Sequence, residues 1–160
     1  MTSIPADPTG PSAMERQGAL IQDLARLALD TIEWPEAWNR AAIAFIPDGE
    51  GWAGRVTFEP PEGDALTADA RFAADSQFTL LLDGLQQATA EQSEAFVSLL
   101  LKIGRNPEDP SAISLGTEFN YDRDPGSFDG VGGVDRAVAQ RMADRLGAER
   151  IPQWVRDLLS

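Results

Sequence analysis

The sequence predicts an α+β protein with a four-stranded antiparallel sheet and helices mainly packed on one face, in the order α-β-β-β-α-β-α. Three observations predict it. Apolar residues recur at helical spacing in two long segments, they alternate with polar residues in shorter segments, and proline- or glycine-bearing turns separate the segments. At 160 residues, we expect a flexible lead-in over residues 1–12 and a single domain over 13–160.

The first helix has a recognisable start and stop in the sequence. Ser12, followed three residues later by Glu15, forms a capping-box pattern. Apolar residues then recur at helical spacing, and Pro35 forces the residue before it out of the helical region. We therefore expect a helix over about residues 13–33.

Three strands are expected next, near residues 39–46, 52–59 and 65–72. The second and third alternate apolar and polar side chains, which is typical of a half-buried strand. The segment DGEG (48–51) predicts a hairpin turn between the first two. An antiparallel meander is the simplest arrangement of the three.

A long helix is expected over 76–103, with Asp75 or Ser76 as its cap. The clearest strand of the chain follows near 112–121, where apolar and polar side chains alternate regularly. A third helix over about 134–146 and a short amphipathic end, IPQWVRDLLS, complete the order. Trp154 in that end is interpreted either as a docking anchor or as a side chain that packs back on the sheet.

The chain has neither cysteine nor histidine. This excludes disulfides, thiolate metal sites, cysteine nucleophiles, Ser-His-Asp triads and imidazole general bases. Paired carboxylates could still hydrolyse glycosides, but any acidic chain contains some such pair, so the pattern has little specificity. We therefore expect no enzymatic activity, no cofactor and no metal.

Charge is the strongest signal in the composition. The chain has 13 basic and 26 acidic residues, a net charge of −13, and the acids gather in residues 59–94 and 108–135. Nucleic acids and anionic membranes are thereby disfavoured as partners, because both require a positive surface. No stretch is apolar enough to span a bilayer, and the start lacks the order of a signal peptide, so we expect a soluble, cytoplasmic protein.

The segment EFNYDRDPGSFDG (118–130) resembles a calcium loop superficially. Counted from Asp122, however, Gly126 stands where an oxygen ligand is needed and Gly133 where the closing glutamate is needed. The following glycines, DGVGGVDRA, also lack the spacing of a phosphate loop, and Asp135 is a better helix cap than a phosphate neighbour. A solvated turn or another kind of cation site stays possible for this segment.

The order of the expected elements, the tryptophan-marked first strand and the EFNYD ending resemble the YezG-type immunity proteins of bacterial polymorphic toxin systems. In that family the fourth strand ends in a Phe-acid-Tyr-acid run. The matching residues here are Phe119, Tyr121 and Asp122, with Asn120 where an acid is common. The resemblance covers about residues 15–125, and the chain departs from the family pattern after that.

The resemblance implies a small acidic protein that binds a cognate toxin, often a nuclease, and blocks it by occlusion. An acidic protein suits this role, because charge complementarity speeds its association with a basic cleft. The alternative is an acidic secretion chaperone, which would hold an effector protein partly unfolded in an apolar groove. In either case we expect a basic protein toxin or effector as the partner.

The expected partner-binding site is an acidic edge built on the 118–130 segment. Strand alternation turns Tyr121 toward the core and Asp122 toward solvent, and Phe128 could supply an apolar anchor. The alternative is that Phe128 folds back against the third helix and the acids are merely solvated. The residues expected at this edge are Asp64, Asp69, Asp75, Asp122, Asp124, Phe128 and Asp129.

Overall fold

The computed structural model describes residues 12–106, 108–109 and 111–160. Its elements are α1 (Ala13–Thr31), β1 (Arg40–Asp48), β2 (Gly51–Glu59), β3 (Leu66–Phe72), α2 (Gln77–Gln92), β4 (Ser98–Arg105), β5 (Ile113–Asn120), α3 (Arg136–Leu146), a 3-10 turn η1 (Ala148–Arg150) and α4 (Gln153–Asp157). Of the expected lead-in, Ser12 alone lies within the described residues. None of the helices described there combines the length and the hydropathy needed to cross a membrane.

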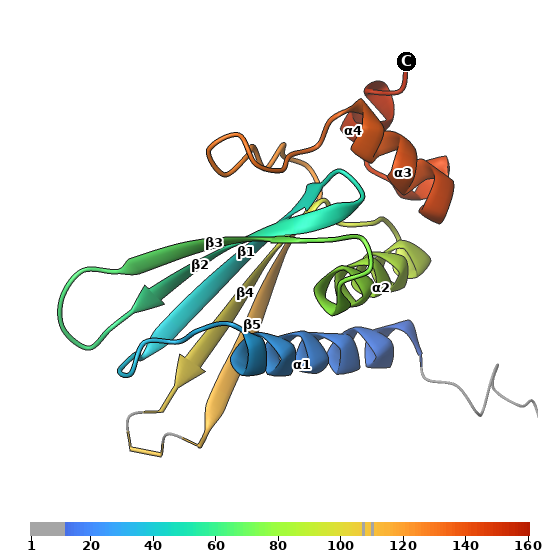
Figure 1. Ribbon diagram of the computed structural model, residues 1–160. Helices are drawn as coiled ribbons and strands as arrows, with labels where there is room; N and C mark the ends of the chain where they lie inside the picture. The colour runs from blue at the N-terminus through green and yellow to red at the C-terminus, as the bar shows by residue number, and fades with distance from the viewer. Residues whose placement is uncertain (1–11, 107, 110) are drawn as a thin grey trace, which may run out of the picture.

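The protein has the expected α+β architecture. Five antiparallel strands form one sheet in the order β3-β2-β1-β4-β5, and α1 and α2 lie side by side on one of its faces (Figure 1). The three-strand meander and the last strand are confirmed, each boundary lying within two residues of the expected position. Ser12 is confirmed as the N-cap of α1, since its Oγ accepts the Glu15 N–H at 3.1 Å.

The expected helix over 76–103 is wrong in its second half, and with it the expected four-stranded sheet. The helix α2 ends at Gln92, and Ser98–Arg105 forms β4, which lies between β1 and β5. The apolar residues of this segment fit helical spacing, but a short apolar run fits a strand equally well. Its burial alternates, with Leu99, Leu101 and Ile103 buried, because pairing on both sides leaves one face of β4 against the helices.

The main core fills the space between the sheet and the two long helices. It consists of buried apolar side chains from α1, α2 and the helix-facing positions of the strands, including Leu24, Ile43, Phe45, Trp52, Leu82 and Leu101. We call the other side of the sheet the open face, because neither long helix covers it (Figure 1).

The C-terminal part of the chain, to which the family resemblance does not extend, forms a second core. Met142 and Leu146 of α3 and Val155 of α4 are buried together with Ala90 and Val97. The expected third helix is confirmed, with Asp135 as its N-cap. Trp154 packs back rather than outward, since its Nε1 donates to the Tyr121 carbonyl at 2.8 Å.

Candidate partner-binding surface

The loop over residues 121–135 lies at one end of the sheet, which we call the upper end (Figure 1). The strand pairings bring three other features to this end: the β1–β2 turn at Gly49–Glu50, the end of β3 at Phe72 and the end of β5 at Asn120. The loop starts at the edge strand β5 and returns to the middle of the sheet. Its acidic residues therefore lie at the same end of the sheet as those of the β1–β2 turn and of the turn that follows β3.

Arg55 of β2 anchors this loop to the open face. Its Nε and Nη2 donate to the two carboxylate oxygens of Asp69 on β3, at 2.7 and 2.9 Å. Nη2 also donates to Asp129 at 3.0 Å, and the guanidinium lies 4.8 Å from the centroid of the Phe128 ring. Asp69, Phe128 and Asp129, which the sequence analysis expected to contact a partner, therefore all contact Arg55 of the same chain.

The tip of the loop is a tight hairpin. Phe128 and Val131 exchange both backbone hydrogen bonds, at 2.9 and 3.0 Å, around Asp129–Gly130. Both turn residues have positive φ, 53° and 87°, as a type I′ turn requires. The Gly133 N–H then donates to the Pro47 carbonyl at 2.7 Å, so the loop is tied to β1 as well.

Phe128 is half-buried at this hairpin, with the Arg55 guanidinium over its ring, so part of its side chain already packs within the fold. The carboxylates of Asp69 and Asp129 both form ion pairs with Arg55, while the Asp129 side chain stays 90% exposed. We assign Asp69, Phe128 and Asp129 to ordering the loop, because all three contact Arg55. The sequence pattern could not show that Arg55 lies between them.

Asp122 and Asp124 stand where the sequence predicted, exposed at the start of the loop. The Asn120 side chain accepts from the Arg123 N–H at 3.2 Å and donates to its carbonyl at 2.7 Å. The Asp124 carboxylate accepts from the Gly126 N–H at 2.9 Å. These local bonds fix the backbone, and neither carboxylate forms an ion pair within the part of the chain that the structure describes.

The two remaining predicted residues lie at opposite ends of the sheet. Asp75 is exposed between β3 and α2, at the upper end, whereas Asp64 lies in the β2–β3 loop at the lower end. Asp64 therefore does not belong to the predicted edge. Glu50, which sequence reasoning missed, is exposed in the upper turn, and the DGEG hairpin signal could have placed it there. We call the exposed upper acids that form no ion pair within the described residues the acidic rim: Glu50, Asp75, Asp122 and Asp124.

The surface charge is poorly balanced around these residues. The described residues hold 25 of the 26 acids in the sequence, and seven of these acidic side chains form ion pairs among the described residues. The basic side chains of these pairs, such as Arg55, bind acids of the same chain and so do not offset the remaining acids. The majority of carboxylates therefore give the protein a negative field that reaches solvent.

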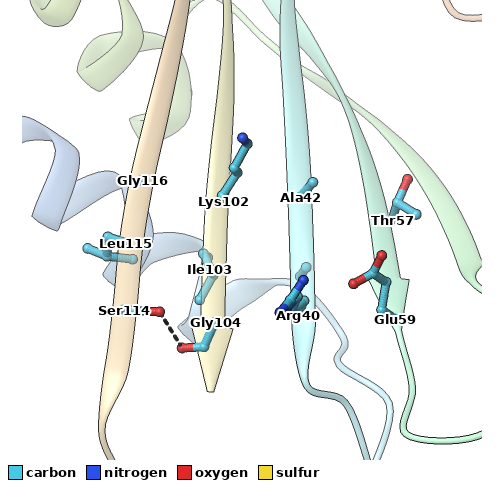
Figure 2. A pocket seen from close by; sticks show the side chains of 11 residues that line it. Arg40, Ala42, Thr57, Glu59, Lys102, Ile103, Gly104, Ser114, Leu115 and Gly116 are labelled. Atoms are coloured by element: carbon cyan, nitrogen blue, oxygen red, sulfur yellow. Dashed lines mark hydrogen bonds between the residues drawn. The ribbon is translucent and has the colours of Figure 1, made fainter. Parts of the chain in front are cut away.

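A shallow groove of about 500 Å³ lies at the lower end of the open face (Figure 2). Small side chains such as Ala42, Thr57 and Gly116 form its floor, and Arg40, Glu59 and Lys102 stand around it. Glu59 is the one carboxylate of this lining, so the described groove lacks the carboxylate pair of a glycoside hydrolase. Across the described ranges, no group of three or more acids is placed to hold a metal ion.

Comparison with known proteins adds no relative to this description. No model of a known protein family matches the chain, and no curated protein matches it.

The Arg55–Asp69 pair predicts a pH dependence of stability. Hydrogen bonding to Arg55 lowers the pKa of Asp69 below its ordinary value of 3.8. A carboxyl with a lowered folded-state pKa stabilises the fold above the unfolded-state value, and this contribution is lost as pH falls through the folded-state value. The wild type should therefore melt above Asp69→Asn at pH 6, and the difference should shrink below about pH 4.

Thermal melts of both proteins between pH 2 and 6 test this expectation. Asp144→Asn is the matched control, because the Asp144 carboxylate accepts from a neutral side-chain amide, that of Gln140. A difference between wild type and Asp69→Asn that stays constant over this range would contradict the ion-pair account.

Proposed function

We propose that the protein is an immunity protein that binds a basic toxin, such as a nuclease, through the acidic rim and blocks it by occlusion. The observation that supports it is that four exposed acids with no ion pair to any described residue lie at one end of the sheet: Glu50, Asp75, Asp122 and Asp124. The resemblance to YezG-type immunity proteins supports the same function. The single long helix on which that resemblance partly depended is a helix and a strand in the structure.

Electrostatics explains why such a surface suits a nuclease inhibitor. Nucleases bind phosphates through basic clefts, and a protein with a net charge of −13 is attracted to them over a long range. Complementary charge mainly raises the association rate and sets the orientation of docking. Occlusion of a cleft requires no catalytic group on the inhibitor.

The anchored loop adds preorganisation to this charge. Arg55, the Phe128–Val131 hairpin and the Gly133–Pro47 bond hold the loop in one conformation before any partner arrives. A preordered loop loses less conformational entropy on binding than a flexible one. The rim acids Asp122 and Asp124 are therefore presented on a defined backbone.

The product of the gene immediately upstream is the partner to test, since an immunity gene is expected to follow its toxin gene. The purified chain should bind the folded toxin domain, inhibit it at equimolar concentration, and associate more slowly as salt is raised. Stopped-flow association at low and moderate salt measures this. Absence of binding at both salt concentrations would refute the proposal.

An effector secretion chaperone is the second candidate, favoured by one observation. Ile113 and Leu115 on the edge strand β5 are 38% and 40% exposed, and apolar side chains of this kind can hold an unfolded segment. A chaperone should bind an unfolded N-terminal segment of the upstream product and ignore its folded domain. The immunity protein should do the reverse.

A further inference from the structure

The edge strand β5 has a full set of outward-facing backbone groups. Arg105 donates its N–H to the Asn39 carbonyl at 2.8 Å, so Arg105 points its backbone groups toward β1. By alternation Gly104 and Lys102 point theirs toward β5, where they pair with Ser114 and Gly116. The outward N–H and C=O groups of β5 are therefore those of Ile113, Leu115, Thr117 and Phe119.

These outward groups have no backbone partner within the described residues, since β5 is the last strand of the sheet. The other edge strand, β3, has charged side chains at Asp69 and Arg71, which protect an edge against further pairing. Between Ile113 and Thr117, β5 has no charge, no proline and no bulge, and it exposes Ile113 and Leu115. The one charged residue of β5, Glu118, is paired with Lys102 of the neighbouring strand, so β5 is the less protected edge of the sheet.

We propose that this edge pairs with the same edge of a second copy, which forms a two-fold symmetric dimer with a continuous sheet. The strand is complementary to itself in an antiparallel register centred on Gly116. In that register Leu115 exchanges backbone bonds with Thr117 of the second copy, and Ile113 does so with Phe119. Every outward N–H and C=O from Ile113 to Phe119 then gains a partner.

The side chains fit this register on both faces. On the helix side, Ile113 and Leu115 are covered by the apolar Phe119 and the Thr117 methyl group of the second copy. On the open face, Gly116 meets Gly116, and Glu118 meets Ser114 rather than another acid. No like charges oppose each other across the seam, which matters for two molecules of net charge −13. This self-complementarity identifies a second copy as the occupant, and the inference is independent of the proposed function.

An engineered cysteine tests both the dimer and its register, because the natural chain has no cysteine. Gly116 lies at a non-hydrogen-bonded position of the proposed pair, where opposing Cα atoms are about 4.5 Å apart, within disulfide range. A Cβ at Gly116 meets nothing nearer than the Lys102 Cβ at 3.9 Å, so Gly116→Cys should fold. Thr67→Cys, exposed on the other edge strand, is the matched control.

Under mild oxidation, Gly116→Cys should form a disulfide-linked dimer much faster than Thr67→Cys, as judged on a non-reducing gel. The wild-type chain should show a concentration-dependent dimer in sedimentation velocity, and Leu115→Lys should be monomeric with unchanged far-UV circular dichroism. Equal cross-linking of the two cysteine variants, or a wild type that is monomeric at all concentrations, would overturn the dimer.

Discussion

Replacing Asp83 by alanine should destabilise the protein by about 3 kcal/mol, which lowers Tm by roughly 10 °C for a chain of this size. Asp83 lies on α2 with a side chain that is 18% exposed. Its carboxylate accepts from Trp52 Nε1 at 2.9 Å and from Arg141 Nη2 at 2.8 Å, and Arg145 lies 3.6 Å away. One carboxylate thus joins the sheet, α2 and the C-terminal helix α3.

The large effect arises from the groups that the substitution would leave behind. Arg141 and Arg145 have side chains 24% and 25% exposed, and burial already lowers the pKa of Arg145. Without Asp83, Arg141 and the indole N–H of Trp52 lose their acceptor, and Arg145, which still donates to Gln86 Oε1, loses its nearby counter-charge; this costs more than the loss of an exposed pair would. Asp83→Asn should be milder, because the amide oxygen can still accept from Trp52.

The control for this prediction is Asp23→Ala. Asp23 pairs with Arg26 at 3.7 Å on the surface of α1, and exposed pairs of this kind contribute about 0–1 kcal/mol. Chemical denaturation of the three variants at neutral pH gives the comparison. If Asp83→Ala unfolded at the same denaturant concentration as Asp23→Ala, the buried network would not hold the C-terminal part to the sheet.

The fold was predictable wherever a local pattern had a single interpretation. The 65–72 segment has clear alternation, and Ser12 with Glu15 marks a helix start, so both were placed correctly. The 98–105 segment was not, because its apolar residues satisfy both helical and strand spacing. Its pairing with β1 and β5, which no local pattern encodes, decides between the two.

The positions of the site residues could be predicted where they depend only on the neighbouring sequence, such as the end of a strand. Asp122 and Asp124 follow the end of an edge strand, and they are exposed. Asp69 and Asp129 were assigned to a partner because their ion pairs with Arg55 span 14 and 74 residues of sequence. Pairing over such separations follows from the sheet register and the loop path, which the sequence pattern does not report.

Reversing the charge of the acidic rim should greatly weaken binding to the toxin. We expect Asp122→Lys with Asp124→Lys to cost about 2–5 kcal/mol of binding free energy, the range found when a charge loses a buried partner across an interface. Folding should be nearly unaffected, because both side chains are exposed and neither forms an ion pair within the described chain. Circular dichroism and thermal melts check that the variant is folded.

The matched control is a double reversal at the lower end of the sheet, Glu62→Lys with Asp64→Lys. Both residues are exposed in the β2–β3 loop, and the pair changes the net charge by the same amount. A general electrostatic attraction would be weakened equally by the two double variants. A docking surface at the upper end would be weakened by the rim variant alone.

The most direct test of the acidic rim is therefore the Kd of the toxin for these three proteins, measured side by side at physiological salt. The proposal predicts that the rim variant binds at least about 30-fold more weakly than wild type, which corresponds to about 2 kcal/mol, while the lower-end variant stays within about threefold. Equal Kd values for the rim and lower-end variants would contradict it.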